Sequence, residues 1–249
     1  MSHQLSQLAA EVGIHLSDDQ VQLLARYCQL LWDWNTRINL TRHTDWEKFV
    51  YRDLLDSYQL AKCLALGERV LDVGSGGGVP GIVLAILRPD LQVVLSESVT
   101  KKARVLEEIV GQLGLPVRVF AERGEAVVAR EPFDAVLFRG VGGMARILRW
   151  FAPTWGHLGR MLMVKGPKWV EERGEARHHG LLRGLELRRV ADYPMPGTSS
   201  HSVILAIRPR PEDSAEPEEP AEVPAEPVKE STKEPVRAPA TGRPKRGQK

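Results

Sequence analysis

The chain has 249 residues, of which 43% are hydrophobic and 27% are charged, and its formal net charge is +2. These values place it among ordinary globular proteins with one large domain and a sizeable core. Its two isolated cysteines, Cys28 and Cys63, exclude a disulfide framework. No Cys/His cluster has the spacing of a zinc site, so we expect no metal.

The sequence predicts neither a secretory signal nor a membrane span. The first residues, MSHQLSQLAAEVG, lack an apolar segment after a basic cluster. No run of about 18 apolar residues occurs anywhere in the chain. We therefore expect a cytoplasmic protein that does not enter a membrane.

Helical patterns fill residues 1–66. Ser17 and Gln20 form a capping-box signature, and apolar residues then recur at helical spacing as far as Ile38. Thr44 and Glu47 repeat the signature before a second amphipathic helix. We predict that this region is helical and packs on the core of the protein.

Short apolar runs alternate with amphipathic stretches in residues 67–208. Five runs are strand-like, with helices predicted between the early ones: RVLDV, LQVVLS, VRVFA, FDAVLF and RMLMV. This alternation favours a parallel sheet with helices on both faces. The last two runs, LELRRVADYP and HSVILAIRP, are joined only by a loop, which favours an antiparallel hairpin. The predicted fold class is α/β: a mostly parallel, seven-stranded sheet that ends in a hairpin, typical of Rossmann-like class I methyltransferases.

Residues 209–249 form a tail rich in Pro, Glu and Lys. Residues 211–234 contain nine acidic and two basic residues, whereas residues 235–249 contain five basic residues and no acidic one. Because the tail has no aromatic residue, it cannot bury enough apolar surface to offset its ordering entropy, and we expect it to be extended or disordered. It is either a solvated appendage or a contact to nucleic-acid phosphates through GRPKRGQK.

Five glycines follow the first predicted strand in LDVGSGGGVPG, residues 71–81. Read from Gly76, this segment fits the dinucleotide pattern G-x-G-x-x-G; read from Asp72, it resembles motif I of S-adenosyl-L-methionine (SAM) methyltransferases. Gly74 already ends the strand and Pro80 suits the first turn of a helix, so the loop lies between Gly74 and Gly78. This placement favours SAM, whose methionine part would lie against bare main chain.

Polar side chains follow the other predicted strands. Glu97 ends the second strand, where its carboxylate can accept hydrogen bonds from both ribose hydroxyls, and Ser98 and Val99 would flank the ribose and adenine. The third, fourth and fifth strands are followed by Arg123 with Gly124 and Glu125, by Arg139, and by Lys165. Since such sheets bind ligands outside the carboxyl ends of their strands, we expect these residues to share one site.

The fourth strand is followed by RGVGG, which contains neither a D/N/S-P-P-Y/F motif nor a cysteine nucleophile. These are the usual features of enzymes that methylate exocyclic amines and pyrimidine C5. Guanine N7, by contrast, already carries a lone pair. As an acceptor it needs no base and mainly has to be aligned with the methyl group. Arginine can contact phosphate and stack on a base, so a ring nitrogen of a nucleic acid is a plausible acceptor.

Seven segments, in order, resemble the bacterial small-subunit rRNA guanine-N7 methyltransferase G family, also called glucose-inhibited division protein B: WNTRINLT, LLDS, LDVGSGGGVPGIVLAILRPD, ESVTKKARVLEE, ERGEAV, FDAVLFRG and MLMVKG. The likeness covers residues 5–208. It implies a SAM-dependent enzyme that methylates N7 of one guanine in the decoding-region loop of 16S rRNA. The expected partner is 16S rRNA or the small ribosomal subunit, and we expect a monomer.

The glycine motif and this resemblance assign residues to two sets. The cofactor set is Asp72, Gly74, Ser75, Gly76, Gly78, Val79, Glu97, Ser98, Val99, Gly124, Glu125 and Arg139. The catalytic and RNA-facing set is Asn39, Arg52, Arg123, Arg139 and Lys165. Two positions depart from the family pattern, which usually has a histidine in place of Asp53 and an aspartate in place of Glu97.

Two alternative functions stay open at this level. The glycine pattern also fits an oxidoreductase that uses a dinucleotide of the NAD type. The chain would otherwise be a non-catalytic RNA-binding protein that retains a SAM pocket.

Overall fold

The computed structural model describes residues 2–211. Its elements are α1 (Ser2–Glu11), α2 (Asp18–Asn35), α3 (Trp46–Lys48), the π-helix η1 (Phe49–Leu54), α4 (Leu55–Ala61), β1 (Arg69–Val73), α5 (Gly81–Leu87), β2 (Gln92–Ser96), α6 (Thr100–Leu113), β3 (Arg118–Phe120), α7 (Gly124–Val128), β4 (Phe133–Arg139), α8 (Met144–Phe151), the 3-10 helix η2 (Ala152–His157), β5 (Leu158–Lys165), α9 (Trp169–His178), β6 (Leu185–Pro194) and β7 (His201–Pro209). Among these residues, no helix combines the length and the hydropathy that a membrane crossing needs. The predicted tail beyond residue 211 lies outside the described residues.

The seven strands form one sheet in the order β3-β2-β1-β4-β5-β7-β6. Strands β1 to β5 are parallel, and β7 runs antiparallel between β5 and β6. The predicted mostly parallel sheet with a terminal hairpin is therefore confirmed. Val73 pairs with Ser96 on one side and with Phe138 on the other, so the strands end together at what we call the carboxyl edge.

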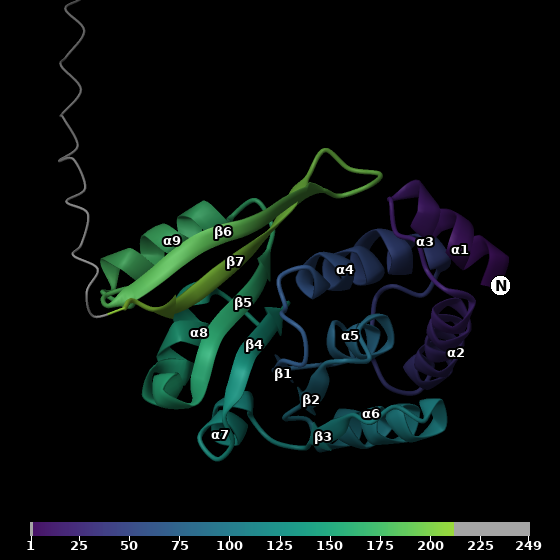
Figure 1. The fold of residues 1–249 in the computed structure, drawn as a ribbon, viewed down its shortest axis with the longest axis horizontal. Helices are drawn as coiled ribbons and strands as arrows, with labels where there is room; N and C mark the ends of the chain where they lie inside the picture. The colour runs from purple at the N-terminus through teal and green to yellow at the C-terminus, as the bar shows by residue number, and fades with distance from the viewer. Residues whose placement is uncertain (1, 212–249) are drawn as a thin grey trace, which may run out of the picture. The chain divides into compact units, whose positions relative to one another are not determined.

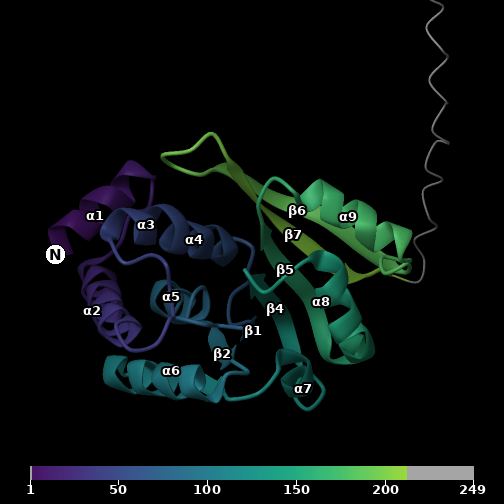
Figure 2. The ribbon, with the colours of Figure 1, turned by 180° about the vertical axis from the view of Figure 1, so that it is seen from behind.

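Two hydrophobic cores cover the two faces of the sheet. Figures 1 and 2 show α4 and α5 on one side of the sheet and α8 and α9 on the other. Strand side chains alternate between the cores: Val70, Leu95, Ala135, Leu137 and Leu162 pack with α1–α6, whereas Leu71, Val73, Val94, Val136 and Phe138 pack with α7–α9. Because both faces are covered, the central strands β1, β2 and β4 are apolar at most positions, as expected for a parallel sheet, whereas the edge strand β6 carries Glu186, Arg188, Arg189 and Asp192.

The N-terminal helices share the first of these cores. In α2 the Ser17 hydroxyl accepts a hydrogen bond from the Gln20 N–H at 3.3 Å, and the Gln20 side chain accepts one from the Ser17 N–H at 3.0 Å, which confirms the predicted capping box. Leu24, Tyr27 and Leu31 are buried on the same helix. The described residues belong to one compact unit, so the boundaries at residues 66 and 208 stay predictions.

Two helices begin one residue later than predicted. Asp45, not Thr44, caps α3, and its Oδ1 accepts a hydrogen bond from the Lys48 N–H at 2.8 Å. A carboxylate serves as well as a hydroxyl in this role, and Asp45 has the extended backbone that a cap requires. Helix α5 begins at Gly81, because Pro80 is its N-cap residue rather than part of the first turn.

Candidate active site at the carboxyl edge

The loop after β1 consists of a tight run of glycines. Gly74, Gly76 and Gly78 have φ values of +67°, +57° and +97°, a region that disfavours side chains. A Cβ at Gly78 would also lie only 2.5 Å from the Ile82 Cδ1 atom. At Gly76, by contrast, a Cβ would meet no atom closer than 3.8 Å. The loop thus presents bare main chain, and a methyl group at Gly76 would make only ordinary van der Waals contacts.

Glu97 joins this loop to the segment that follows β2. Its Oε2 accepts a hydrogen bond from the Gly76 N–H at 3.0 Å, and its Oε1 accepts one from the Val99 N–H at 2.8 Å. The carboxylate is buried, yet each of its oxygens keeps a further lone pair. Val99 and Ser98 are exposed beside it. Each carboxylate oxygen of Glu97 can therefore still accept one more hydrogen bond.

Asp72 lies beneath the glycine loop. Its Oδ2 accepts a hydrogen bond from the Gly81 N–H at 3.1 Å, and its backbone carbonyl accepts one from the Ser75 hydroxyl at 3.0 Å. Burial raises the pKa of Asp72 to about 6, although the Gly81 N–H acts in the opposite direction. Asp72 and Ser75 thus brace the loop from inside the protein.

We expect Asp72→Asn to raise the free energy of unfolding above about pH 7 and to change it little near about pH 4. The raised pKa of Asp72 means that its protonated form favours the folded state, and this contribution is complete below the ordinary pKa of 3.8 and lost as the pH rises through about 6. At about 1.4 kcal/mol per pKa unit, the gain at high pH should be on the order of 2–3 kcal/mol. Urea unfolding of both proteins across this pH range measures it. A difference independent of pH would contradict the assignment.

Helix α2 and the segment between α2 and α3 lie against one side of the glycine loop. The Tyr27 hydroxyl donates a hydrogen bond to the Gly77 carbonyl at 2.8 Å. The Leu40 carbonyl oxygen would lie 3.4 Å from a Cβ on Gly77. Asn35 Oδ1 fixes this turn by accepting a hydrogen bond from the Leu40 N–H at 2.8 Å. The predicted residue Asn39 is exposed in the same turn.

Arg139, the last residue of β4, binds two buried carboxylates. Its Nε donates to Asp56 Oδ2 at 2.7 Å, and its Nη2 donates to Asp53 Oδ1 at 2.5 Å. His43 Nδ1 lies 2.8 Å from the same Asp53 oxygen, and the Tyr193 hydroxyl donates to Asp56 Oδ1 at 2.8 Å. We call these five residues the Arg139 cluster. Burial lowers the pKa of Arg139, but the charges of Asp53 and Asp56 outweigh it and raise the pKa.

The second oxygen of Asp53, Oδ2, is buried and has no hydrogen-bond partner among the described residues. The four other members of the Arg139 cluster are absent from the predicted site. A signal for two of them existed: Asp53 and Asp56 interrupt an apolar helical stretch at a spacing of three, and carboxylates on a buried face need a cationic partner.

Lys165, the last residue of β5, also forms hydrogen bonds within the protein. Its Nζ donates to the Gly142 carbonyl at 2.6 Å and to Glu172 Oε2 at 2.7 Å. The same Glu172 oxygen accepts a hydrogen bond from the Met144 N–H at 2.7 Å, at the start of α8. Lys165 is buried by these contacts, which join β5 to α8 and α9. Glu172 is a further residue that sequence reasoning missed.

The remaining predicted residues differ in exposure. Arg123 is exposed at the start of α7, 3.8 Å from Glu125. Gly124 follows it where a Cβ would lie 2.6 Å from Val73 Cγ2, so the backbone packs directly on β1. Arg52 is half-buried in η1, and its side chain has no partner among residues 2–211. The structure brings the cofactor set together around the carboxyl edge, whereas the roles of all these residues stay predictions.

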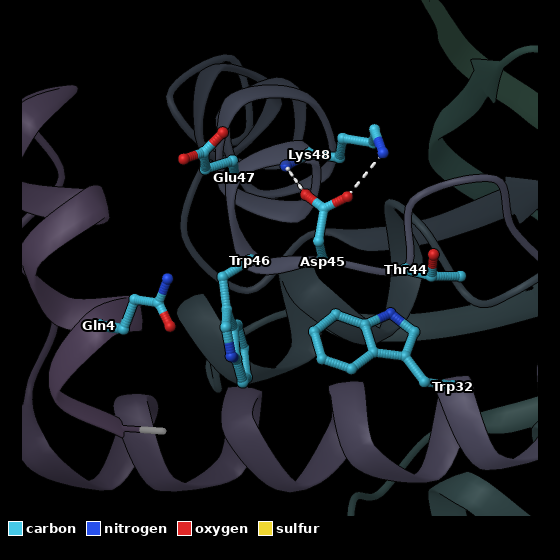
Figure 3. Close-up of a pocket in the computed structure, with 7 residues that line it drawn as sticks. All are labelled: Gln4, Trp32, Thr44, Asp45, Trp46, Glu47 and Lys48. Atoms are coloured by element: carbon cyan, nitrogen blue, oxygen red, sulfur yellow. Dashed lines mark hydrogen bonds and ion pairs between the residues drawn. The ribbon is translucent and has the colours of Figure 1, made fainter.

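A hollow of about 500 Å³ lies apart from these residues, between α1, α2 and the segment 44–48 (Figure 3). Trp32 and Trp46 pack in it edge to face, with ring centroids 4.8 Å apart, and Asp45 pairs with Lys48. No residue of the predicted site lines it. Trp46 belongs to the hydrophobic core, and Trp32 packs against it.

The chain matches a family of known function. Residues 20–195 fit the GidB family, described as rRNA small subunit methyltransferase G. The chain is 54% identical over 185 residues to the ribosomal RNA small subunit methyltransferase G of Rhodopirellula baltica, covering 74% of this chain and 80% of that protein. It is 41% identical to the protein of the same name from Chromobacterium violaceum, covering 78% and 91% of the two chains.

Solved structures resemble the fold at low sequence identity. MtNAS in complex with MTA and tNA has a TM-score of 0.50 and 18% identity over 76% of this chain and 71% of its own. TrmK from M. capricolum, in complex with S-adenosyl-homocysteine, has a TM-score of 0.50 and 14% identity over 65% of this chain and 71% of its own. From its sequence matches, the chain belongs to the GidB family, rRNA small subunit methyltransferase G, and is a SAM-dependent methyltransferase.

Proposed function

We propose that this protein transfers a methyl group from SAM to N7 of one guanine in the decoding-region loop of 16S rRNA, as a monomer in the cytoplasm. The observation that carries the proposal is the glycine loop held to Glu97 at the carboxyl edge, in a chain of this family. Family membership excludes the NAD-type oxidoreductase. The choice of guanine N7 rests on the resemblance of the sequence motifs.

The residues at the carboxyl edge fit SAM. A Cβ at Gly76 would meet no protein atom closer than 3.8 Å, so the methionine part can approach the main chain there, and Glu97 keeps free lone pairs for ribose hydroxyls. Val99, with 48% of its surface exposed, offers an apolar contact for the adenine. When bound, SAM supplies an activated methyl group on a positively charged sulfur.

The chain itself has mainly to align the acceptor. The segment that follows Arg139, residues 140–143, contains glycines and a valine and no side chain that could act as a base. This composition suits an acceptor atom with a free lone pair, which requires positioning at about 3–3.5 Å from the methyl group. The side chains of Arg42, Arg52 and Lys168 have no partner among the described residues and are available for phosphates. Binding to RNA should therefore weaken steeply as salt increases.

Incubation with labelled SAM tests the proposal. The substrates are naked 16S rRNA and unmodified small subunits, and we expect label on a single guanine, located by mapping the modified base. Calorimetry should show that SAM and S-adenosylhomocysteine bind and that NAD does not. SAM binding without label on either substrate would support the non-catalytic alternative instead.

Glu97→Ala and Lys165→Ala should separate cofactor binding from RNA methylation. Loss of the Glu97 carboxylate removes hydrogen bonds of about 1.5–3 kcal/mol each, so we expect the SAM dissociation constant to rise by at least about tenfold. Lys165→Ala should leave SAM affinity within about threefold and lower the methylation rate, because Lys165 contacts Glu172 and Gly142 rather than the glycine loop. Glu97→Gln, which keeps one acceptor oxygen, is the matched control. Calorimetry and rate measurements decide, and equal SAM affinity in all three variants would refute this division of roles.

A further inference from the structure

His43 is held rigidly in the segment between α2 and α3, which lies against the glycine loop. Its backbone N–H donates to Thr41 Oγ1 at 3.0 Å, and its carbonyl accepts a hydrogen bond from the Trp32 indole N–H at 2.9 Å. Its ring Nδ1 lies 2.8 Å from Asp53 Oδ1. The other ring nitrogen, Nε2, has no partner among residues 2–211, and 28% of the side chain is exposed. One polar atom of a fixed imidazole is thus free to meet a ligand.

The contacts of Asp53 decide which tautomer the ring adopts. A carboxylate only accepts hydrogen bonds, so the imidazole nitrogen that faces it, Nδ1, must carry the proton. In a neutral ring Nε2 is then a hydrogen-bond acceptor. Position 53, where the family pattern usually has a histidine, holds an aspartate in this chain. This aspartate is the residue that the His43 imidazole contacts.

His43 is connected both to the glycine loop and to the carboxyl end of β4. Three residues before it, the Leu40 carbonyl lies against Gly77 of the glycine loop. Through Asp53, the His43 ring is joined to Arg139 at the carboxyl end of β4. A base whose N7 is aligned with a methyl donor above this loop would therefore have another of its edges near Nε2.

The net negative charge of the Arg139 cluster suits the positive charge that the purine gains in the reaction. Asp53 and Asp56 contribute two negative charges and Arg139 one positive charge, so the cluster is left with a net charge of −1 when His43 is neutral. Methyl transfer breaks the sulfur–methyl bond, leaves its electron pair on sulfur, and forms the new bond with the N7 lone pair. The positive charge thereby moves from sulfur to the purine. Its N1–H then becomes more acidic and a stronger hydrogen-bond donor.

We propose that His43 Nε2 accepts a hydrogen bond from the N1–H of the target guanine, and that this bond strengthens as the purine becomes positively charged. The inference rests on the proposed methylation of guanine N7. It makes His43 a catalytic residue and a determinant of specificity, because adenine N1 carries no hydrogen and would oppose its lone pair to that of Nε2. Asp53 is then the positioning residue that fixes the ring.

The test combines protein variants with altered bases. Wild type, His43→Ala and His43→Gln are compared on RNAs that carry guanine, inosine or 2-aminopurine at the mapped target position. Inosine keeps N1–H and lacks the 2-amino group, whereas 2-aminopurine keeps N7 and lacks N1–H. His157→Ala is the control, because His157 is an exposed histidine at the amino end of β5, away from the carboxyl edge. The kcat, the KM for RNA and the SAM affinity are measured for each enzyme.

We expect His43→Ala to lower kcat on guanine by about tenfold to a hundredfold while SAM affinity stays unchanged. His43→Gln, which retains an acceptor oxygen, should recover part of this loss, and His157→Ala should match wild type. Substitution of 2-aminopurine should slow wild type at least about tenfold more than it slows His43→Ala, whereas inosine should slow both equally.

The comparison cancels any intrinsic change in N7 reactivity, because both enzymes meet the same base. Equal slowing of wild type and His43→Ala by 2-aminopurine would overturn the inference, as would an unchanged kcat in His43→Ala. In both cases wild type would still methylate guanine N7, and the proposed function would stand. A wild type that methylates no RNA would refute the proposed function and this inference with it.

Discussion

Arg139→Ala is expected to lower the free energy of unfolding by about 3–5 kcal/mol. The substitution leaves Asp53 and Asp56, with exposed fractions of 1% and 6%, without their guanidinium partner. Removing one partner of a buried ion pair is costly because the remaining charge is neither solvated nor neutralised. Urea unfolding at neutral pH measures the change. SAM affinity should also fall, since Arg139 ends β4 at the carboxyl edge.

Two controls separate this effect from the general loss of an arginine. Arg160→Ala removes a guanidinium that binds one carboxylate, Glu68, and the Cys63 carbonyl near the opposite end of the sheet, and should cost less because one carboxylate rather than two loses its partner. A variant that combines Arg139→Met with Asp53→Asn and Asp56→Asn removes all three charges and should regain much of the lost stability. If Arg139→Ala lowered the free energy of unfolding as little as Arg160→Ala, the Arg139 cluster would not hold buried charge.

The sheet and the glycine loop could be predicted because their signals are local. Strands such as RVLDV and FDAVLF are short apolar runs, and their length and spacing already distinguish crossovers from the final hairpin. Gly74, Gly76 and Gly78 adopt positive φ values that few other residues tolerate, so their pattern marks the loop directly. Glu97 follows at a fixed distance along the chain. Each of these features can be read within about twenty residues.

The Arg139 cluster could not be predicted in the same way, because its members come from four separate parts of the chain. Arg139 lies 83 residues from Asp56, and Tyr193 lies 137 residues from it. Periodicity shows which face of a helix is buried but not which strand end will meet it. Lys165 and Glu172 are only seven positions apart, so their pairing has a different reason: a turn after β5 sets the direction of α9, and periodicity does not predict that turn.

We expect Gly76→Ala to weaken SAM binding by at least about tenfold, a loss of about 1.4 kcal/mol or more in binding free energy. A Cβ at this position meets no protein atom closer than 3.8 Å, so the folded protein has room for the methyl group. The added group would project into the space in which we propose that the methionine part of SAM lies. The residue also has a φ of +57°, which should cost about 1–2 kcal/mol of folding stability.

Gly67→Ala is the matched control, because it separates the cost of backbone strain from the loss of the ligand contact. Gly67 has a φ of +74°, and a Cβ there would meet nothing within 4 Å, but it lies just before β1, at the end of that strand remote from the loop. Both variants should therefore lose similar stability in urea, while only Gly76→Ala should lose SAM affinity by calorimetry. Unchanged affinity in Gly76→Ala would show that SAM does not approach the main chain there, because the Gly67 variant already accounts for strain.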